Sequence, residues 1–204
     1  MSHDAPAATS ERSSGIRAEL RKSKKGCSIF NMYYGQIKNC DIANGEGVRV
    51  SLFVSGCRNR CEGCFQPETW DFSYGKPFDE EAEAEIIELL KMSYIKGLTI
   101  LGGEPFEPEN QRALVPFVEK VKSLFHDKDI WIFSGYTFEE LSGGSSHPRC
   151  EVTDKLLFLT DVLVDGRFVL SQKDISLKFR GSKNQRILDV YESLKQKKPV
   201  LFYK

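Results

Sequence analysis

The chain has 204 residues, of which 40% are apolar and 28% charged, the balance of a globular protein with one domain-sized core. Lysine plus arginine and aspartate plus glutamate each number 29, so the formal charges cancel. This balance argues against a general nucleic-acid binder, which needs surplus positive charge to displace counterions from phosphates. We also expect no membrane span, because no apolar run approaches the roughly 18 residues that a bilayer requires.

The first 26 residues are rich in serine, alanine, lysine and arginine and contain no apolar stretch. Because a secretory signal needs a hydrophobic segment, we expect instead a disordered, mildly basic extension at 1–26, followed by a folded domain at 27–204. A transit peptide is the alternative, although Asp4, Glu11 and Glu19 count against it. Without an export signal we expect a reducing cytoplasm, where the six cysteines are thiols or metal ligands rather than disulfides.

Hydrophobic periodicity and turn residues divide the rest of the chain into alternating strands and helices. In chain order, the predicted elements are a turn at 44–47, a buried strand at 48–54, a cysteine-rich loop at 55–70, a helix at 79–92 capped by Asp79, a strand at 98–101, a helix at 114–125 in which Pro116 marks a kink or a late start, a strand at 129–134, a helical turn at 137–141, a helix at 153–159, a strand at 162–164, a polar loop at 180–186, a helix at 187–194 and a last strand at 199–203.

This alternation predicts an α/β fold in which parallel strands are joined by crossover helices. Ligands bind such sheets at the carboxyl ends of the strands. The conspicuous loops all follow predicted strands: the cysteine loop, the glycine pair at 102–103, Ser134-Gly135 and Asp165-Gly166. We therefore expect one site, built where these loops meet.

Cys57, Cys61 and Cys64 place three thiols within eight residues. Soft thiolates select iron–sulfur clusters, zinc or Cu(I). A structural zinc site wants four protein ligands, and no fourth ligand lies nearby in the sequence. Three thiolates on a four-iron cluster leave one iron open to a substrate or cofactor. The alternative is a zinc knuckle completed by Cys27, Cys40, Cys150 or a histidine.

Cys-x3-Cys-x2-Cys after a first strand resembles the radical S-adenosylmethionine (SAM) superfamily. The segment 41–57, Cys61-Glu-Gly-Cys64-Phe65 and Thr69-Trp70 resemble the activating enzymes of glycyl-radical proteins. Within these, the segments 162–168 and 180–186 are similar to those that activate anaerobic ribonucleoside-triphosphate reductases. The resemblance covers residues 41–190. One departure from the superfamily pattern is Gly63, since an aromatic residue often precedes the third cysteine.

The resemblance implies an open partial (βα) barrel of about five to six mostly parallel strands, too open-sided to be a full barrel and therefore able to admit a protein substrate. It implies a [4Fe-4S] cluster on the three cysteines, with SAM on the open iron. Reductive cleavage of SAM then generates a glycyl radical on the reductase, with electrons from a low-potential donor such as flavodoxin or ferredoxin. The alternatives are an activase of a pyruvate formate-lyase type of enzyme and a non-catalytic zinc or iron–sulfur module.

The same resemblance assigns the SAM amino group to Gly102, Gly103 and Glu104, whose sequence otherwise describes only a turn. It assigns the adenine to Gly63 and Phe65, which flank Cys64. Two glycines allow close backbone approach, and a carboxylate accepts hydrogen bonds from an ammonium group.

Further polar residues have both functional and structural interpretations. We expect the Ser134 hydroxyl to reach the ligand, and Asp165 either to do the same or to serve as a turn residue. Arg58 and Arg60 are either solvated charges or residues that offset thiolate charge and dock an acidic electron donor.

The remaining polar loops and isolated thiols give weaker signals. Ser182, Asn184 and Gln185 form either a recognition loop or a solvated one. Two kinds of residue stay outside the predicted site, histidines at the surface and isolated cysteines in the core: His3, His126, His147, Cys27, Cys40 and Cys150.

Overall fold

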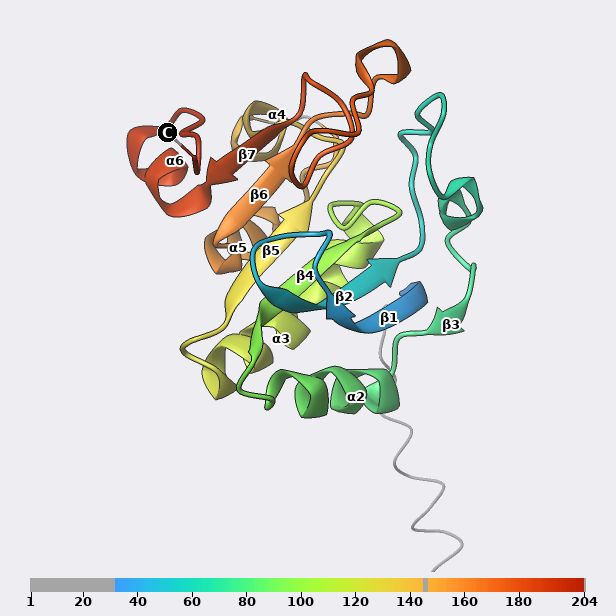
Figure 1. Cartoon of the computed structure of the whole chain (residues 1–204), viewed down its shortest axis with the longest axis vertical. Helices are drawn as coiled ribbons and strands as arrows, with labels where there is room; N and C mark the ends of the chain where they lie inside the picture. The colour runs from blue at the N-terminus through green and yellow to red at the C-terminus, as the bar shows by residue number, and fades with distance from the viewer. Residues whose placement is uncertain (1–31, 145–146, 204) are drawn as a thin grey trace, which may run out of the picture.

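The computed structural model describes residues 32–144 and 147–203 (Figure 1). The predicted extension at 1–26 and the predicted domain start at Cys27 lie outside the described residues. The described elements, in chain order, are β1 (Tyr33–Asp41), β2 (Val48–Val54), η1 (Pro67–Trp70), β3 (Lys76–Pro77), α2 (Glu80–Leu90), β4 (Ile95–Gly102), α3 (Pro108–Leu124), β5 (Asp129–Phe133), α4 (Phe138–Ser142), α5 (Thr153–Leu159), β6 (Val162–Asp165), η2 (Leu170–Gln172), β7 (Arg186–Asp189) and α6 (Val190–Gln196).

The described strands form one seven-stranded sheet in the order β3-β1-β2-β4-β5-β6-β7 (Figure 1). The central strands β2, β4, β5 and β6 are parallel, as the alternation of strands and helices predicted. The outer strands β1, β3 and β7 pair antiparallel with their neighbours. The expected count of five to six strands was too low. β1 was missed because most of its residues are half-buried or exposed, so it lacks the apolar run of the central strands.

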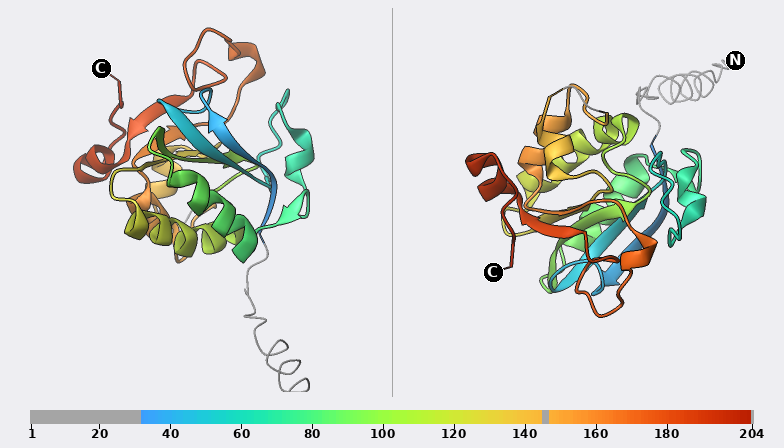
Figure 2. Two further views of the ribbon diagram at one scale, coloured as in Figure 1. Left: turned by 60° about the horizontal axis from the view of Figure 1, so that its bottom comes forward. Right: turned by 90° about the horizontal axis from the view of Figure 1, so that it is seen from above.

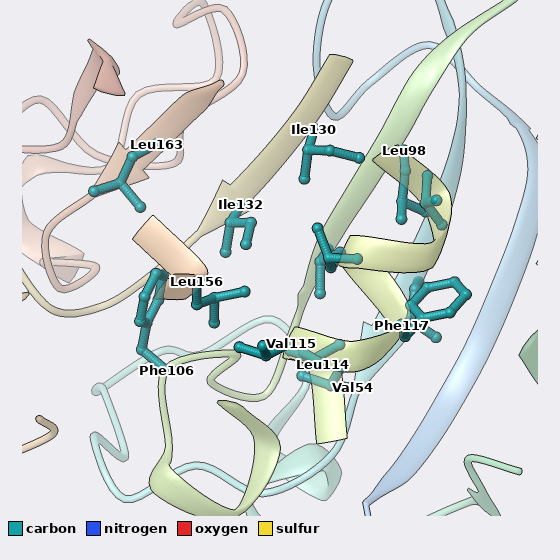
Figure 3. Close-up of a cluster of buried hydrophobic side chains, with 14 of the residues drawn as sticks. Val54, Leu98, Phe106, Leu114, Val115, Phe117, Ile130, Ile132, Leu156 and Leu163 are labelled. Atoms are coloured by element: carbon teal, nitrogen blue, oxygen red, sulfur yellow. The ribbon is translucent and has the colours of Figure 1, made fainter. Parts of the chain in front are cut away.

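Alternating residues of the central strands face opposite sides of the sheet. One set packs beneath α2, α3, α4 and α5 in the main core, whose central side chains Figure 3 shows. Figure 2 shows α2 and α3 together on one side of a curved sheet. The other set, which includes Arg49, Phe53, Thr99 and Trp131, lines the inner face. The parallel strands therefore have a helix-covered face and a concave inner face.

At the amino ends of the strands, the inner face is closed by a buried cation. The Arg49 guanidinium lies 2.6 Å from Asp129 Oδ1, and its Nε donates to Thr99 Oγ1 at 2.6 Å. It also lies 5.3 Å from the Trp131 ring. A Cβ on Gly97 would lie 2.9 Å from Arg49 Nη2 and closer still to the Asp129 carbonyl, so this glycine makes room for the ion pair.

The helices between the central strands lie near their predicted positions. Asp79 caps α2 as expected, because its carboxylate accepts from the Glu81 and Ala82 N–H groups. The helix predicted at 114–125 begins earlier, at Pro108, where proline suits the first turn. Pro116 therefore lies inside α3 and does not mark its start. No helix in residues 32–144 and 147–203 combines the length and apolarity needed to cross a bilayer.

Two predictions near the carboxyl terminus were only partly right. The helix expected at 187–194 is a strand, β7, followed by a helix, α6, which Asp189 caps by accepting from the Glu192 N–H. Ile187 and Leu188 are buried because β7 extends the sheet beside β6. The strand expected at 199–203 is reduced to a single bridge at Leu201. Phe202 instead packs edge-on against Trp131 on the inner face.

Candidate functional site

The carboxyl ends of β2, β4, β5 and β6 surround a cavity of about 510 Å³. Phe53, Leu101 and Phe133, the last inward-facing side chains of three of these strands, line it. The loops that follow the strands supply the chemically distinctive lining: Cys57, Cys61, Cys64, Gly102, Gly103 and Glu104. The structure thus brings together the cysteine loop and the Gly-Gly-Glu loop, as the sequence predicted.

The cysteine loop is held in place by backbone hydrogen bonds to η1. The Gly56 N–H donates to the Thr69 carbonyl at 2.8 Å, and the Cys57 N–H donates to the Trp70 carbonyl at 3.3 Å. Gly56 has a φ of +94°, which favours glycine. Cys57 is buried, and the other two cysteines of the loop are half-buried.

The Cys57 and Cys61 thiols lie in an environment that favours their protonated form. Burial raises the pKa of the Cys57 thiol to about 12, and the nearby charge of Glu104 adds to this rise. Burial also raises the pKa of Cys61. Because thiolates are the metal-binding form, ligation at this loop must release protons.

Among the residues that the structure describes, no three His, Cys, Asp or Glu side chains converge closely enough to hold one metal ion. Cys57, Cys61 and Cys64 nevertheless line the same cavity. In a multinuclear cluster each thiolate ligates a different iron, so three cysteines that line one cavity can share such a cluster. The donor set is therefore chemically suited to an iron–sulfur cluster.

Glu107 is a buried carboxylate that holds the cysteine loop through Arg58. The sequence analysis missed it. Its Oε1 accepts from the Arg58 N–H at 2.7 Å, and its Oε2 lies 2.5 Å from Arg58 Nη1. The exposed Glu109 also pairs with Arg58, at 2.6 Å. Arg58 is thus bound to two carboxylates and is not a free surface charge. His147 is exposed as predicted, with its Nε2 3.8 Å from Glu107 Oε2.

Asn110, in the first turn of α3, joins the two loops. Its buried side-chain amide donates to the Ser55 carbonyl at 2.9 Å and to the Glu104 carbonyl at 2.8 Å. The sequence analysis missed Asn110 because the predicted helix began at residue 114, whereas α3 begins at Pro108. Asn110 and Glu107 together make the start of α3 the support of the site.

The Gly-Gly-Glu loop passes directly against the cysteine loop. The Gly103 N–H donates to the Val54 carbonyl at 2.7 Å, and the Glu104 N–H donates to the Gly56 carbonyl at 2.8 Å. Gly102 has a φ of +110°, and a Cβ on Gly103 would lie only 2.7 Å from the Gly56 carbonyl oxygen. Both glycines are therefore needed for this close approach.

The Glu104 carboxylate is buried and accepts four hydrogen bonds. Oε1 accepts from the Phe106 N–H and the Ser134 hydroxyl, both at 2.9 Å. Oε2 accepts from the Gly135 N–H at 2.7 Å and the Asn59 amide at 2.9 Å. Burial is the largest influence and raises the pKa of Glu104 to about 7, although these hydrogen bonds oppose it. All four donors are neutral, so no cation in the described part of the chain bonds to this buried carboxyl group.

Of the two residues predicted to contact adenine, Phe65 lines the cavity and Gly63 does not. Phe65 lines the cavity and is 66% exposed, with its ring 5.2 Å from that of Phe168. Gly63 has a φ of +71° but is not among the cavity-lining residues, and a Cβ there would lie 2.8 Å from Leu170 Cδ1. The role of both residues at adenine stays a prediction.

Asp165 is neither an exposed turn residue nor part of the cavity lining. Its Oδ2 accepts from the Phe138 N–H at 2.7 Å and lies 2.5 Å from Arg186 Nη2, while Oδ1 accepts from Arg186 Nε at 2.9 Å. It is completely buried. Asp165 therefore fixes the end of β6 to α4 and β7.

The polar loop after η2 is tightly bonded within itself. The Gln185 side-chain amide donates to the Gly166 carbonyl and its oxygen accepts from the Gly181 N–H. Ser182 donates to Asn184 at 2.7 Å. Gln185 lines the cavity, as does Arg180, a residue that sequence reasoning missed.

The other cysteines lie away from the cavity lining. Cys40 is exposed on β1, so its expected burial was wrong: this side of the strand is open to solvent. Cys150 is half-buried. His126 is exposed as expected, and Cys27 and His3 lie outside the described residues.

Comparison with known proteins identifies the family. Residues 43–188 match the family model described as a 4Fe-4S single cluster domain. Over 158 residues, 76% of this chain, the sequence is 46% identical to the anaerobic ribonucleoside-triphosphate reductase-activating protein of Pasteurella multocida and covers 96% of that relative. The chain belongs to the family of anaerobic ribonucleoside-triphosphate reductase-activating proteins. Relatives of the same name include those of Escherichia coli K12, 40% identical with 96% of the relative covered, and Enterobacteria phage T4, 39% identical with 93% covered.

Membership in this activating-protein family gives the cavity a context. The family match spans the cysteine loop, the Gly-Gly-Glu loop and the segment after β6. The described site therefore lies within the part of the chain that resembles the relatives, and its three cysteines are of the residue type that ligates 4Fe-4S clusters.

Proposed function

We propose that this protein activates an anaerobic (class III) ribonucleoside-triphosphate reductase by radical SAM chemistry. The observation that carries the proposal is the shared cavity, in which three thiols of one loop face a buried carboxylate of the next. The names of the relatives support the reductase as the partner.

Cys57, Cys61 and Cys64 would hold a [4Fe-4S] cluster, leaving one iron for the amine and carboxylate of SAM. The chemistry supplied on binding would be reductive cleavage of SAM, in which one electron from the external donor breaks a carbon–sulfur bond, methionine leaves, and a hydrogen atom passes from a glycine of the partner to form 5′-deoxyadenosine. Glu104 would accept a hydrogen bond from the SAM ammonium group, because a buried anion bonded only to neutral donors favours a cation.

The Gly102-Gly103 backbone would let the amino-acid part of SAM lie close to the cysteine loop, since a side chain at Gly103 would strike that loop. Phe65 and Gly63 remain the proposed neighbours of the adenine. The apolar lining, Phe53, Leu101 and Phe133, would limit water beneath the reacting atoms.

We interpret the sheet as an open partial barrel of the radical SAM type. Its two edge strands, β3 and β7, have no pairing with each other in the described part of the chain, and the sheet is curved (Figure 2). An open side would admit a loop of a protein substrate. A low-potential donor such as flavodoxin or ferredoxin, in the cytoplasm, would supply the electrons.

Anaerobic reconstitution with iron and sulfide, followed by dithionite and SAM, tests the chemistry. We expect about four irons per chain and formation of 5′-deoxyadenosine, both lost in Cys57→Ala, Cys61→Ala and Cys64→Ala. Cys40→Ser and Cys150→Ser are matched controls and should keep both, because neither residue lines the cavity. One zinc per chain and no product would instead support a non-catalytic module.

Partner identity needs a separate assay. We expect an electron paramagnetic resonance signal of a glycyl radical on the anaerobic reductase after incubation with the reduced protein and SAM. A signal on a pyruvate formate-lyase, and none on the reductase, would replace the proposed partner while leaving the chemistry intact.

A further inference from the structure

Asn59 occupies a position on Glu104 that a bound ammonium group would need. Its amide nitrogen donates to Glu104 Oε2 at 2.9 Å, and Asn59 lies in the cavity lining between Cys57 and Cys61. A carboxylate has about four lone-pair sites, and the four donors to Glu104 use them all. A new donor can therefore reach this carboxylate only by replacing one already present.

Three of the four donors cannot easily leave. The N–H groups of Phe106 and Gly135 belong to the backbone. The Ser134 hydroxyl is buried and also accepts from the Tyr136 N–H at 3.0 Å, so its position is fixed from both sides. Asn59, by contrast, is a half-buried side chain of a loop. It is the donor that a ligand can replace.

Two neighbours hold Asn59 in this position. Arg167 Nε donates to the Asn59 carbonyl oxygen at 3.1 Å, which turns the amide nitrogen toward Glu104. A Cβ on Gly135 would lie 2.5 Å from Asn59 Nδ2, so the glycine leaves space for the amide. The position of Asn59 is thus built from the loops after β2, β4, β5 and β6.

We infer that Asn59 is an internal competitor for the ammonium group of the ligand, displaced from Glu104 when that group binds. This inference rests on the proposed function. Displacement also breaks the only side-chain bond described between the cysteine loop and Glu104, so ligand binding releases the loop from the Gly-Gly-Glu loop at that point. Asn59 is therefore a positioning residue that sets ligand affinity and couples the ligand to the cysteine loop.

Isothermal titration of the reconstituted, cluster-containing protein under anaerobic conditions tests this inference with two probes. S-adenosylhomocysteine carries the amine, whereas 5′-methylthioadenosine lacks the whole amino-acid part. In Asn59→Ala we expect S-adenosylhomocysteine to bind about three- to tenfold more tightly, because the hydrogen bond from the amide to Glu104 no longer has to be exchanged on binding. The affinity for 5′-methylthioadenosine should stay unchanged.

Asn59→Ser serves as a second variant, with a polar side chain too short to reach Glu104, and should give a change in the same direction. Gln66→Ala removes another cavity-lining amide of the same loop, one with no bond to Glu104, and should leave the ratio of the two affinities unchanged.

Unchanged or weaker binding of S-adenosylhomocysteine to both Asn59 variants would overturn the inference and leave the proposed function standing. Equal tightening of both probes would also overturn it, because that result indicates a wider cavity and not a vacated carboxylate. If neither probe binds any form of the protein, the proposed function fails and the inference fails with it.

Discussion

The two ends of the inner sheet face bury polar groups in opposite ways. At the amino ends of the strands, Arg49 is paired with Asp129 and bonded to Thr99 beside Trp131. At the carboxyl ends, Glu104 is equally buried, but its bonded donors are all neutral. The same strands therefore carry one end whose charges are matched internally and one end whose charge is not.

This difference agrees with our proposal that the carboxyl ends bind a ligand, whereas the amino ends contribute to the stability of the fold. The buried Arg49 is neutralised by the half-buried Asp129 and makes further hydrogen bonds, so it needs no external partner. A buried carboxylate whose pKa is raised to about 7 still gains from an external cation. The three thiols lie at this second end.

The largest loss of stability should come from removing the Arg49–Asp129 ion pair at the amino ends of the strands. We expect Arg49→Met to lower the free energy of unfolding by about 3–5 kcal/mol, because it leaves Asp129 without its partner and removes buried hydrogen bonds. Urea denaturation measures this. A loss below about 1 kcal/mol would show that the amino end is not held by this ion pair.

A smaller loss of stability is expected from changing Glu107, which holds the cysteine loop at the carboxyl ends of the strands. Glu107→Gln should lower the free energy of unfolding by about 1.5–3 kcal/mol, since it weakens charge-assisted bonds to Arg58, and should reduce iron uptake. Glu109→Gln is the matched control: it affects the same arginine from the surface and should cost about 0–1 kcal/mol. Denaturation and iron analysis of both variants check the difference. Equal effects would mean that burial of Glu107 is unimportant.

The pH dependence of ligand affinity sharpens the comparison further. Because the pKa of Glu104 is about 7, the carboxylate is ionised above this pH and protonated below it. An ammonium group needs the ionised form, so S-adenosylhomocysteine should bind more weakly as pH falls below 7, by up to about tenfold per unit. Titrations between pH 6 and 8 measure this. The slope should disappear in Glu104→Gln, and a slope that persists there would assign the titration to another group.

The smallest change in stability is expected at Cys40, which lies away from both the Arg49 ion pair and the cavity. Cys40→Ser should change the free energy of unfolding by less than about 0.5 kcal/mol and leave iron content unchanged, because Cys40 is exposed on β1. Loss of iron in this variant would contradict the assignment of the cluster to the cavity.

Much of the site could be predicted from the sequence because its parts follow strands directly. Cys57 and Gly102 lie just beyond or at the ends of β2 and β4, and parallel neighbours bring their carboxyl ends to one edge. The central strands are apolar runs, and the Asp79 cap is a local signal. These features depend on periodicity or on residues near each other in the chain.

The parts that were missed depend on contacts between distant residues. Glu107 holds the cysteine loop by contacting Arg58, which lies 49 positions away in the chain. The stretch Arg186–Asp189 is too short to show a strand period, and it becomes a strand because the edge of β6 is available for pairing. Cys40 was misplaced because burial was inferred from residue type, whereas its strand has one side open to solvent.

Glu104 joins segments from three separate loops, since Asn59, Phe106 and the pair Ser134-Gly135 all donate to it. An alanine scan would consequently rank this position among the most damaging for architectural reasons alone. Loss of turnover in such a variant would say little about contact with a reactant, and only variants that keep the acceptor pattern can separate assembly of the loops from chemistry.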